Sequence, residues 1–219
     1  MPLLLLDLDN TLVDRDAAFR DAVVAFLGER ALAASDADWL MAVDASGYTP
    51  RHKVAAAMTD RYGGRVAESA VKALLDRGGA DRVVLPTAVR TALKEAGDSG
   101  WTCVVVTNGR TAQQEAKIRG CGLDQVVHGW VVSETVGHKK PEPDIFRAAA
   151  ATAGVPIRDA WMIGDSPHAD IAGAHGLGLR SVWISGDRVW SEAAFAPTRV
   201  ARDAATAIRC VTGAQRPAA

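Results

Sequence analysis

The sequence predicts an α/β fold, a Rossmann-like parallel sheet with helices on both faces, and a small all-helical segment inserted after the first strand. From residue 83 onward, short apolar runs alternate with stretches of helical periodicity. Strands that alternate with helices form parallel sheets covered on both faces. No strand-like run interrupts residues 15–81. We therefore expect an α/β core formed by residues 1–14 and 82–219, and a helical insertion formed by residues 15–81.

The predicted insertion follows the first predicted strand, the leucine run Leu3–Leu6. Apolar residues of the insertion recur at spacings near three and four, which is the period of an amphipathic helix. Pro50 favours a helix start, because proline fits the first turn of a helix. The helical segments expected in the insertion are 16–27, 35–43, 49–58 and 66–75.

Further predicted strands and helices alternate in the rest of the core. The expected strands are 103–106, two short extended runs at 126–127 and 131–132, and then 160–163 and 181–184. The expected helices are 87–95, 111–119, 143–153 and 169–175. The residues after Ile208, ending in 213–219, are expected to fray, as chain ends do when nothing holds them.

Composition limits the partners of this chain. Its 219 residues are 48% hydrophobic and 23% charged, which is typical of a globular protein. The formal net charge of −1 lacks the basic excess that nucleic acid or an acidic membrane attracts, so neither is expected as a partner. The run Leu3–Leu6 is too short for a signal peptide or a membrane span. Three cysteines without metal-type spacing fit a reducing compartment, and we expect a cytoplasmic protein.

Polar residues follow three of the predicted strands. Asp7 and Asp9 come directly after the first strand, Thr107 and Asn108 after the second, and Asp165 after a later one. In a parallel sheet the carboxyl ends of the strands meet at one edge, where ligands bind. We therefore expect these side chains to gather there.

Several carboxylates at one edge need a positive charge nearby, because like charges a few ångströms apart raise the pKa of at least one of them. Asp170 follows Asp165 by five residues and adds to the negative charge, and a loop at 137–141, just before a predicted helix, carries basic residues. Magnesium prefers oxygen ligands and commonly takes a few carboxylates. No cluster of histidine and cysteine in the sequence favours a softer metal. The sequence therefore predicts a Mg²⁺ site.

Taken in order, these motifs resemble the haloacid dehalogenase superfamily, in particular its magnesium-dependent phosphatase branch with a helical cap. The motifs are Asp7-Leu8-Asp9-Asn10-Thr11-Leu12, Thr107-Asn108-Gly109, Lys140-Pro141-Glu142-Pro143, and Gly164-Asp165 with Asp170. The resemblance implies Mg²⁺-dependent hydrolysis of a small phosphorylated metabolite, a phosphomonoester, through an aspartyl-phosphate intermediate. It also implies that residues 15–81 form a cap domain. A monomer or a homodimer would both fit.

The resemblance assigns the covalent chemistry and the metal to three aspartates. Asp7 matches the nucleophile that attacks phosphorus. Asp9 matches the general acid that protonates the leaving oxygen and later activates water. The metal ligands implied are the side chains of Asp7 and Asp165 and the backbone carbonyl of Asp9.

The resemblance assigns phosphate binding to Thr107, through its hydroxyl, to Asn108, through its backbone amide, and to Lys140, which also pairs with the nucleophile. Lys139 adjoins Lys140, but the family pattern places its lysine directly before proline, so Lys139 is expected to be a solvated neighbour. Asp170 matches a residue that orients bound water or Lys140.

Three other functions fit parts of the pattern. A haloacid dehalogenase uses the same aspartate nucleophile to attack a carbon atom. An acid at the position of Asp9 argues against this function, because it serves phosphoryl transfer and not halide displacement. A sugar phosphomutase returns the phosphoryl group to its substrate. This alternative stays open. A receiver-type phospho-switch binding domain also gathers carboxylates, a threonine and a lysine around magnesium, but its phosphorylated aspartate lies on a middle strand. Within the insertion, the basic group Arg51, His52 and Lys53 fits a solvated helix start better than a substrate contact, and its role stays open.

Overall fold

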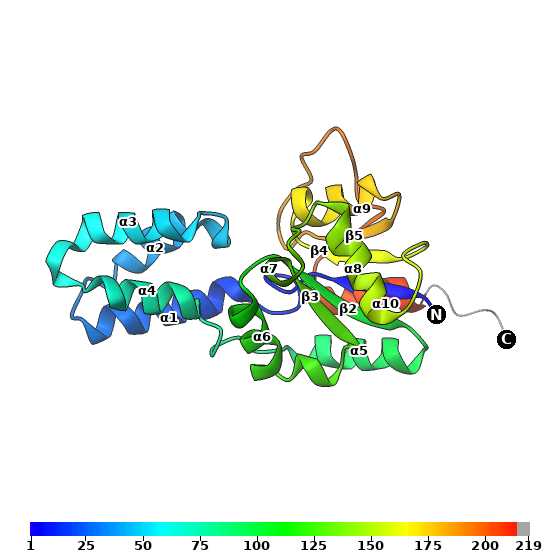
Figure 1. Cartoon of the computed structure of the whole chain (residues 1–219), viewed down its shortest axis with the longest axis horizontal. Helices are drawn as coiled ribbons and strands as arrows, with labels where there is room; N and C mark the ends of the chain where they lie inside the picture. Colours follow the sequence, from blue (N-terminus) through cyan, green and yellow to red (C-terminus); the bar gives the residue numbers. More distant parts are fainter. Residues whose placement is uncertain (214–219) are drawn as a thin grey trace. The chain divides into compact units, whose positions relative to one another are not determined.

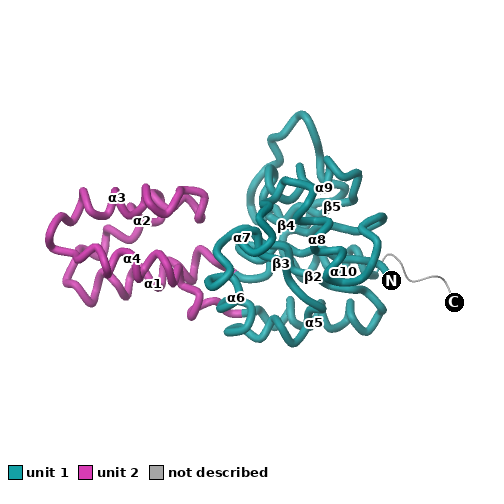
Figure 2. Tube along the Cα trace, in the orientation of Figure 1, with its two compact units in different colours: residues 1–13, 85–219 teal, residues 14–84 magenta. Residues whose placement is uncertain are grey.

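The computed structural model describes residues 1–213 and divides the chain into two compact units (Figure 2). Of the described residues, 1–13 and 85–213 form the first unit, and 14–84 form the second. The sequence-based expectation for the insertion was 15–81. We call the two parts the core unit and the helical unit.

Six parallel strands form one sheet in the core unit, in the order β3-β2-β1-β4-β5-β6 (Figure 1). The strands are β1 (Leu3–Leu6), β2 (Thr102–Thr107), β3 (Gly129–Val132), β4 (Trp161–Gly164), β5 (Arg180–Ile184) and β6 (Arg199–Ala201). All residues of β1, β2 and β4 are buried, as expected for strands that are covered on both faces. The predicted parallel α/β fold is confirmed.

Helices cover the sheet on both faces. The helices of the core unit are α5 (Thr87–Asp98), α6 (Thr111–Gly120), α7 (Ser133–Val136), α8 (Pro143–Ala153), α9 (Ala172–Gly176) and α10 (Ala204–Thr212). Helix α8 contacts β1, β2 and β3, and its Phe146 shares a buried apolar cluster with Leu3 and Leu5. Helices α5 and α10 pack on each other and contact β2 and β4, respectively. This packing keeps β1 in the dry centre of the sheet.

Two expectations about the core unit were wrong. Residues 126–127 are not extended, because Val126 N–H donates to the carbonyl of Leu123 and closes a turn. The chain does not fray directly after Ile208, because α10 continues to Thr212 and buries Ile208 and Val211. The rest of that expectation, for residues 214–219, lies outside the described residues. The sequence prediction also missed β6 and α10 as elements.

Four helices form the helical unit: α1 (Arg15–Glu29), α2 (Asp36–Asp44), α3 (Arg51–Tyr62) and α4 (Glu68–Arg77). Helix α1 is capped by Asp14, whose side chain accepts a hydrogen bond from Ala17 N–H. The four helices share one apolar core, which includes Phe19, Leu40, Met58 and Leu74. The unit therefore has a core of its own, as expected of a separately packed domain.

A charged network lies inside this unit. The Arg15 guanidinium, 2% exposed, donates to Asp44 Oδ2 at 2.5 Å, and Arg51 donates to Asp44 Oδ1 at 2.6 Å. The backbone N–H of Gly47 also donates to Asp44, at 2.8 Å. Asp44 therefore joins both arginines to the loop after α2, and Arg51 takes part in the packing of the unit.

Replacing Asp44 by alanine is expected to destabilise the protein by about 3–5 kcal/mol, because it leaves the buried Arg15 charge without its carboxylate. Urea unfolding followed by circular dichroism measures this loss. Asp38→Ala is the matched control on the same helix, because its pair with Arg20 is exposed and contributes little. Equal losses in the two variants would contradict the argument.

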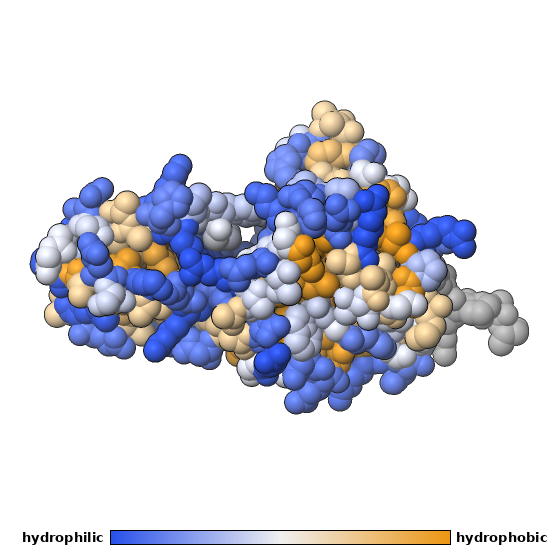
Figure 3. Space-filling view, in the orientation of Figure 1, coloured by the Kyte–Doolittle hydropathy of each residue, from blue (hydrophilic) through white to orange (hydrophobic). Residues whose placement is uncertain are grey.

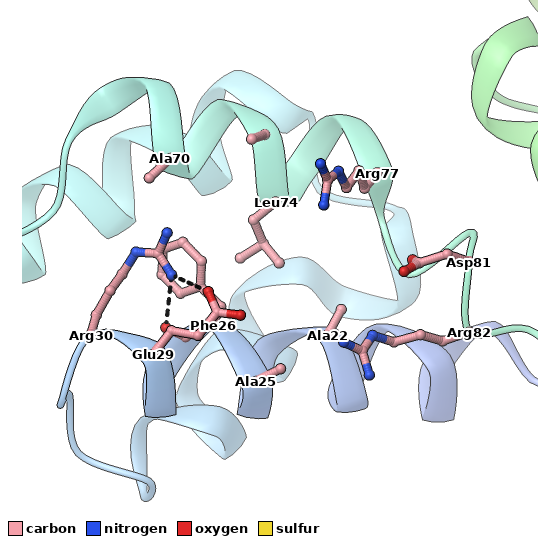
Figure 4. Close-up of a pocket in the computed structure, with 11 residues that line it drawn as sticks. Ala22, Ala25, Phe26, Glu29, Arg30, Ala70, Leu74, Arg77, Asp81 and Arg82 are labelled. Carbon is pink, nitrogen blue, oxygen red and sulfur yellow. Dashed lines mark hydrogen bonds and ion pairs between the residues drawn. The ribbon is translucent and has the colours of Figure 1, made fainter.

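A pocket opens between α1 and α4 of the helical unit (Figure 4). Small and apolar residues such as Ala22 and Leu74 line it, together with arginines and the two acidic residues Glu29 and Asp81. The guanidinium carbon of Arg30, another lining residue, lies 4.0 Å from the centre of the Phe26 ring.

Hydrophilic atoms cover much of the face shown in Figure 3, with apolar patches between them. The large apolar residues that are exposed are scattered along the chain: Met1, Val24, Tyr48, Val84, Val189 and Val200. Among residues 1–213, no helix combines the length and the apolar character that crossing a bilayer requires.

Candidate active site

The carboxyl ends of three neighbouring strands form the site. Asp7 follows β1, Thr107 is the last residue of β2, and Asp165 follows β4. Because β1 lies between β2 and β4, these residues come to the same edge of the sheet. Asp7 N–H donates to the carbonyl of Ile163 at 2.9 Å, which continues the pairing of β1 and β4 past the end of β1.

Lys140 enters this edge from the loop before α8. Its Nζ lies 2.5 Å from Asp7 Oδ1 and 2.7 Å from Asp170 Oδ1. Both carboxylates are buried, and so is the lysine. Lys139, by contrast, is exposed. The structure therefore brings together the lysine and two of the aspartates that the sequence singled out.

Carboxylate oxygens of Asp7, Asp165 and Asp170 all lie within 4.8 Å of one another. Burial, together with the neighbouring carboxylates, raises the pKa of Asp7 to about 7 against the attraction of Lys140. Burial and the charges of Asp7 and Asp170 raise the pKa of Asp165 to about 8. Burial by itself would lower the pKa of Lys140, but Asp170 and Asp7 outweigh it and raise that pKa. Lys140 and the Arg188 guanidinium, whose Nη2 lies 3.4 Å from Asp165 Oδ2, offset the charge of the three carboxylates only in part.

This donor set fits magnesium. Oxygen ligands and excess negative charge are what a hard divalent cation requires, and the cluster supplies both. The Asp9 carboxylate is not part of this cluster, because Lys117 and Gln114 hold it. The implied ligation by the Asp9 backbone carbonyl stays a prediction, as do the roles assigned to the other site residues.

Hydrogen bonds from neighbouring residues position Asp170 and Asp165. Asp170 Oδ2 accepts from Ser166 N–H at 3.0 Å, and a side chain at position 164 would collide with the Asp170 carboxylate, so glycine is required there. The carbonyl of Asp165 accepts from Trp183 Nε1 and Arg188 Nη2, both at 2.9 Å. Both aspartates are thus positioned by the turn after β4 and by residues of the β5 region.

Asn108 joins the loop after β2 to the loop that carries Lys140. Its Oδ1 accepts from Lys140 N–H at 2.8 Å, and its Nδ2 donates to the Lys140 carbonyl at 3.0 Å. The side chain therefore fixes the lysine backbone. The sequence argument considered only the backbone amide of Asn108.

Two residues of α6 were missed by sequence reasoning. Lys117 Nζ lies 2.7 Å and 2.8 Å from the two carboxylate oxygens of Asp9. Gln114 Nε2 donates to Asp9 Oδ2 at 3.0 Å and to Thr107 Oγ1 at 2.6 Å. Both α6 residues are 1% exposed. The available signal was the near absence of large apolar residues in α6, whose inward face therefore carries polar groups.

Most of the chain matches one family of known proteins. Residues 1–178 match the haloacid dehalogenase-like hydrolases. The chain belongs to this family.

Several curated proteins are similar to part of the chain. It is 38% identical to a phosphoserine phosphatase of Thermus thermophilus over 42% of this chain and 37% of that protein. It is 32% identical to a glyceraldehyde 3-phosphate phosphatase of Pyrococcus abyssi over 43% of this chain and 40% of that protein. The matched stretch thus spans less than half the length of these relatives.

Solved structures are similar over nearly the whole chain. A hydrolase of the family from Bacillus subtilis, described as bound to magnesium, superposes with a TM-score of 0.74 at 21% identity, covering 96% of this chain and 98% of that one. A phosphatase of the family from Thermococcus onnurineus gives 0.69 at 20% identity, covering 99% and 100%. At these identities the likeness concerns the fold.

Proposed function

We propose that this family member is a magnesium-dependent phosphatase that hydrolyses a phosphomonoester of a small metabolite through an aspartyl phosphate. The observation that carries the proposal is the buried Asp7 carboxylate, held by Lys140 at 2.5 Å beside Asp165 and Asp170. The names of the curated relatives, which are phosphatases, support the same reaction.

Asp7 is the nucleophile in this proposal. Lys140 contacts its Oδ1, which leaves Oδ2 to form the bond to phosphorus as the bond from phosphorus to the leaving oxygen breaks. An aspartate suits this step because its carboxylate needs no separate base once it is ionised. Water then attacks the aspartyl phosphate, releases inorganic phosphate and regenerates Asp7.

Asp9 transfers the protons. It gives a proton to the leaving oxygen in the first step and takes one from the attacking water in the second. Its carboxylate is the less buried of the two, with 27% of the side chain exposed against 10% for Asp7. This exposure gives a leaving group and water access to Asp9.

The transferring phosphoryl group is bound by Lys140, the Thr107 hydroxyl and the Asn108 backbone amide. These groups lie at or beside the strand ends and stabilise charge on the phosphoryl oxygens. Asp7 and Asp165, with the backbone carbonyl of Asp9, would hold Mg²⁺, and the bound ion would offset phosphoryl charge. Asp170 orients Lys140 through their 2.7 Å contact.

The helical unit is the cap in this proposal. Its residues 14–84 lie in the sequence between the motif of Asp7 and that of Thr107. Lids of this kind exclude water and select substrates. The size and charge of the accepted phosphoester would then depend on this unit.

A panel of phosphorylated metabolites, scored by free phosphate, tests the proposal. Phosphoserine, glyceraldehyde 3-phosphate, pyrimidine nucleoside monophosphates, phosphoglycolate and sugar phosphates form the panel. The full chain with Mg²⁺ is expected to hydrolyse the best of them with a kcat/KM of at least about 10⁴ M⁻¹s⁻¹. EDTA should abolish this activity, and excess Mg²⁺ should restore it.

Full activity in EDTA would contradict the metal site. Isomerisation of a sugar phosphate with little phosphate release would identify a mutase instead. Phosphate release from no member of the panel would contradict the phosphatase assignment.

A further inference from the structure

We propose that Lys117 and Gln114 of α6 are positioning residues that hold the Asp9 carboxylate in place for proton transfer. The inference rests on the proposed function, because it concerns the role of Asp9 in that reaction. It depends on contacts between α6 and the strand ends that no sequence motif suggested.

Lys117 holds Asp9 at both oxygens, at 2.7 Å and 2.8 Å. An ammonium group at both oxygens restricts rotation of the carboxylate about its last side-chain bond. A buried lysine is costly unless it is paired with an anion, and this lysine is 1% exposed. Separating the buried lysine from Asp9 would therefore cost free energy, and this cost holds the Asp9 carboxylate in its position.

Gln114 lies one helical turn before Lys117 and completes the contact. Its amide nitrogen donates to Asp9 Oδ2 at 3.0 Å and to Thr107 Oγ1 at 2.6 Å, and the Asn108 carbonyl lies farther away, at 3.4 Å. An amide oxygen in this place would face the carboxylate and repel it, so Asp9 determines which way the amide points. Because Thr107 Oγ1 accepts from Gln114, the threonine proton is directed elsewhere and is available to a phosphoryl oxygen.

Lys117 and Gln114 hold Asp9 after β1, and Gln114 also contacts the Thr107 hydroxyl at the end of β2. General acid catalysis requires the acid to lie within hydrogen-bond reach of the leaving oxygen, so its position decides the rate. A group that only stabilises the fold would affect every substrate alike. A group that positions Asp9 affects most the substrates whose leaving oxygen must be protonated.

Lys117→Met tests this difference with two substrates, an alkyl phosphate from the panel and p-nitrophenyl phosphate. We expect kcat for the alkyl phosphate to fall by about 10²-fold, the lower end of what general acid catalysis contributes. We expect kcat for the aryl phosphate, whose leaving group needs little protonation, to change less than about threefold. KM should stay within a factor of about three for both substrates, again because the change affects proton transfer.

Four further variants sharpen the test. Asp9→Asn should show the same substrate selectivity, and adding Lys117→Met to it should cause little further loss, because the two residues act as one unit. Lys117→Arg keeps the positive charge and should recover part of the alkyl activity. Arg119→Met on the same helix is the control, because its side chain is 61% exposed, and it should leave both activities unchanged.

Gln114→Met changes the other positioning residue. It tests the inference independently if Lys117→Met does not fold. Its loss on the alkyl substrate should exceed its loss on the aryl substrate, and a smaller loss common to both is expected because Gln114 also contacts Thr107 Oγ1. Equal losses on both substrates, or no loss, in the folded variants would overturn the inference while wild-type phosphate release and a selective Asp9→Asn keep the proposed function. A wild-type protein that hydrolyses neither substrate would overturn both.

Discussion

Asp7→Asn is expected to lower phosphate release by about 10⁶-fold, the order seen when a hydrolase loses its nucleophile. The amide oxygen that replaces the carboxylate carries no charge and cannot form the acyl phosphate. Loss of this group also ends covalent labelling. Wild-type protein incubated with substrate labelled at phosphorus should retain label on the chain after rapid quenching, and the variant should not.

The free energy of unfolding of Asp7→Asn shows whether the loss of activity comes from the missing nucleophile or from misfolding. Burial raises the pKa of Asp7 to about 7 from 3.8, so the folded protein binds a proton there more tightly than the unfolded chain does. This contribution to the free energy of unfolding therefore falls as the pH rises from 3.8 to about 7. The amide introduced by Asp7→Asn does not titrate, so in EDTA the variant should lack this part of the pH dependence and should be at least as stable at neutral pH.

Asp9→Asn is the matched control for the nucleophile. It carries the same chemical change two residues away and should still be labelled by an aryl phosphate. An Asp7→Asn variant that turns over within about tenfold of the wild type would remove Asp7 from its assigned role.

The parts of the site that lie at strand ends could be predicted from the sequence. An apolar run such as Leu3–Leu6 marks a buried strand, and parallel strands bring their carboxyl ends together. That argument brought Asp7, Thr107 and Asp165 to one edge, and in the structure they lie at the carboxyl ends of neighbouring strands. The resemblance added Lys140, which no strand carries.

The partners of Asp9 could not be predicted in the same way. Lys117 and Gln114 lie in the middle of a helix, where lysine and glutamine are usually solvated. Their burial depends on where α6 packs, which is a tertiary property. The same limit explains residues 126–127, where a turn overrides two β-branched residues. Helix α10, by contrast, was predictable, because Ala204, Ile208 and Val211 recur at helical spacing and form its buried face.

Lys140→Met should lower kcat by about 10²–10³-fold, the loss found when one stabilising donor is removed from an active site. Lys140 contacts both Asp7 and Asp170, so methionine leaves these two buried carboxylates facing each other beside Asp165. Removing one partner from a buried ion pair costs about 3–5 kcal/mol. We therefore expect a lower melting temperature in EDTA, together with the loss of activity.

Lys139→Met is the matched control for this prediction, because the neighbouring side chain is exposed, and it should change neither activity nor stability. Asp170→Asn added to Lys140→Met removes one of the two opposed carboxylates and should restore part of the melting temperature but not the activity. This separation is expected because the second change relieves repulsion between buried carboxylates but does not restore the ammonium group that contacts Asp7. Full activity in Lys140→Met, or equal losses in the two lysine variants, would show that Lys140 does not stabilise the phosphoryl group.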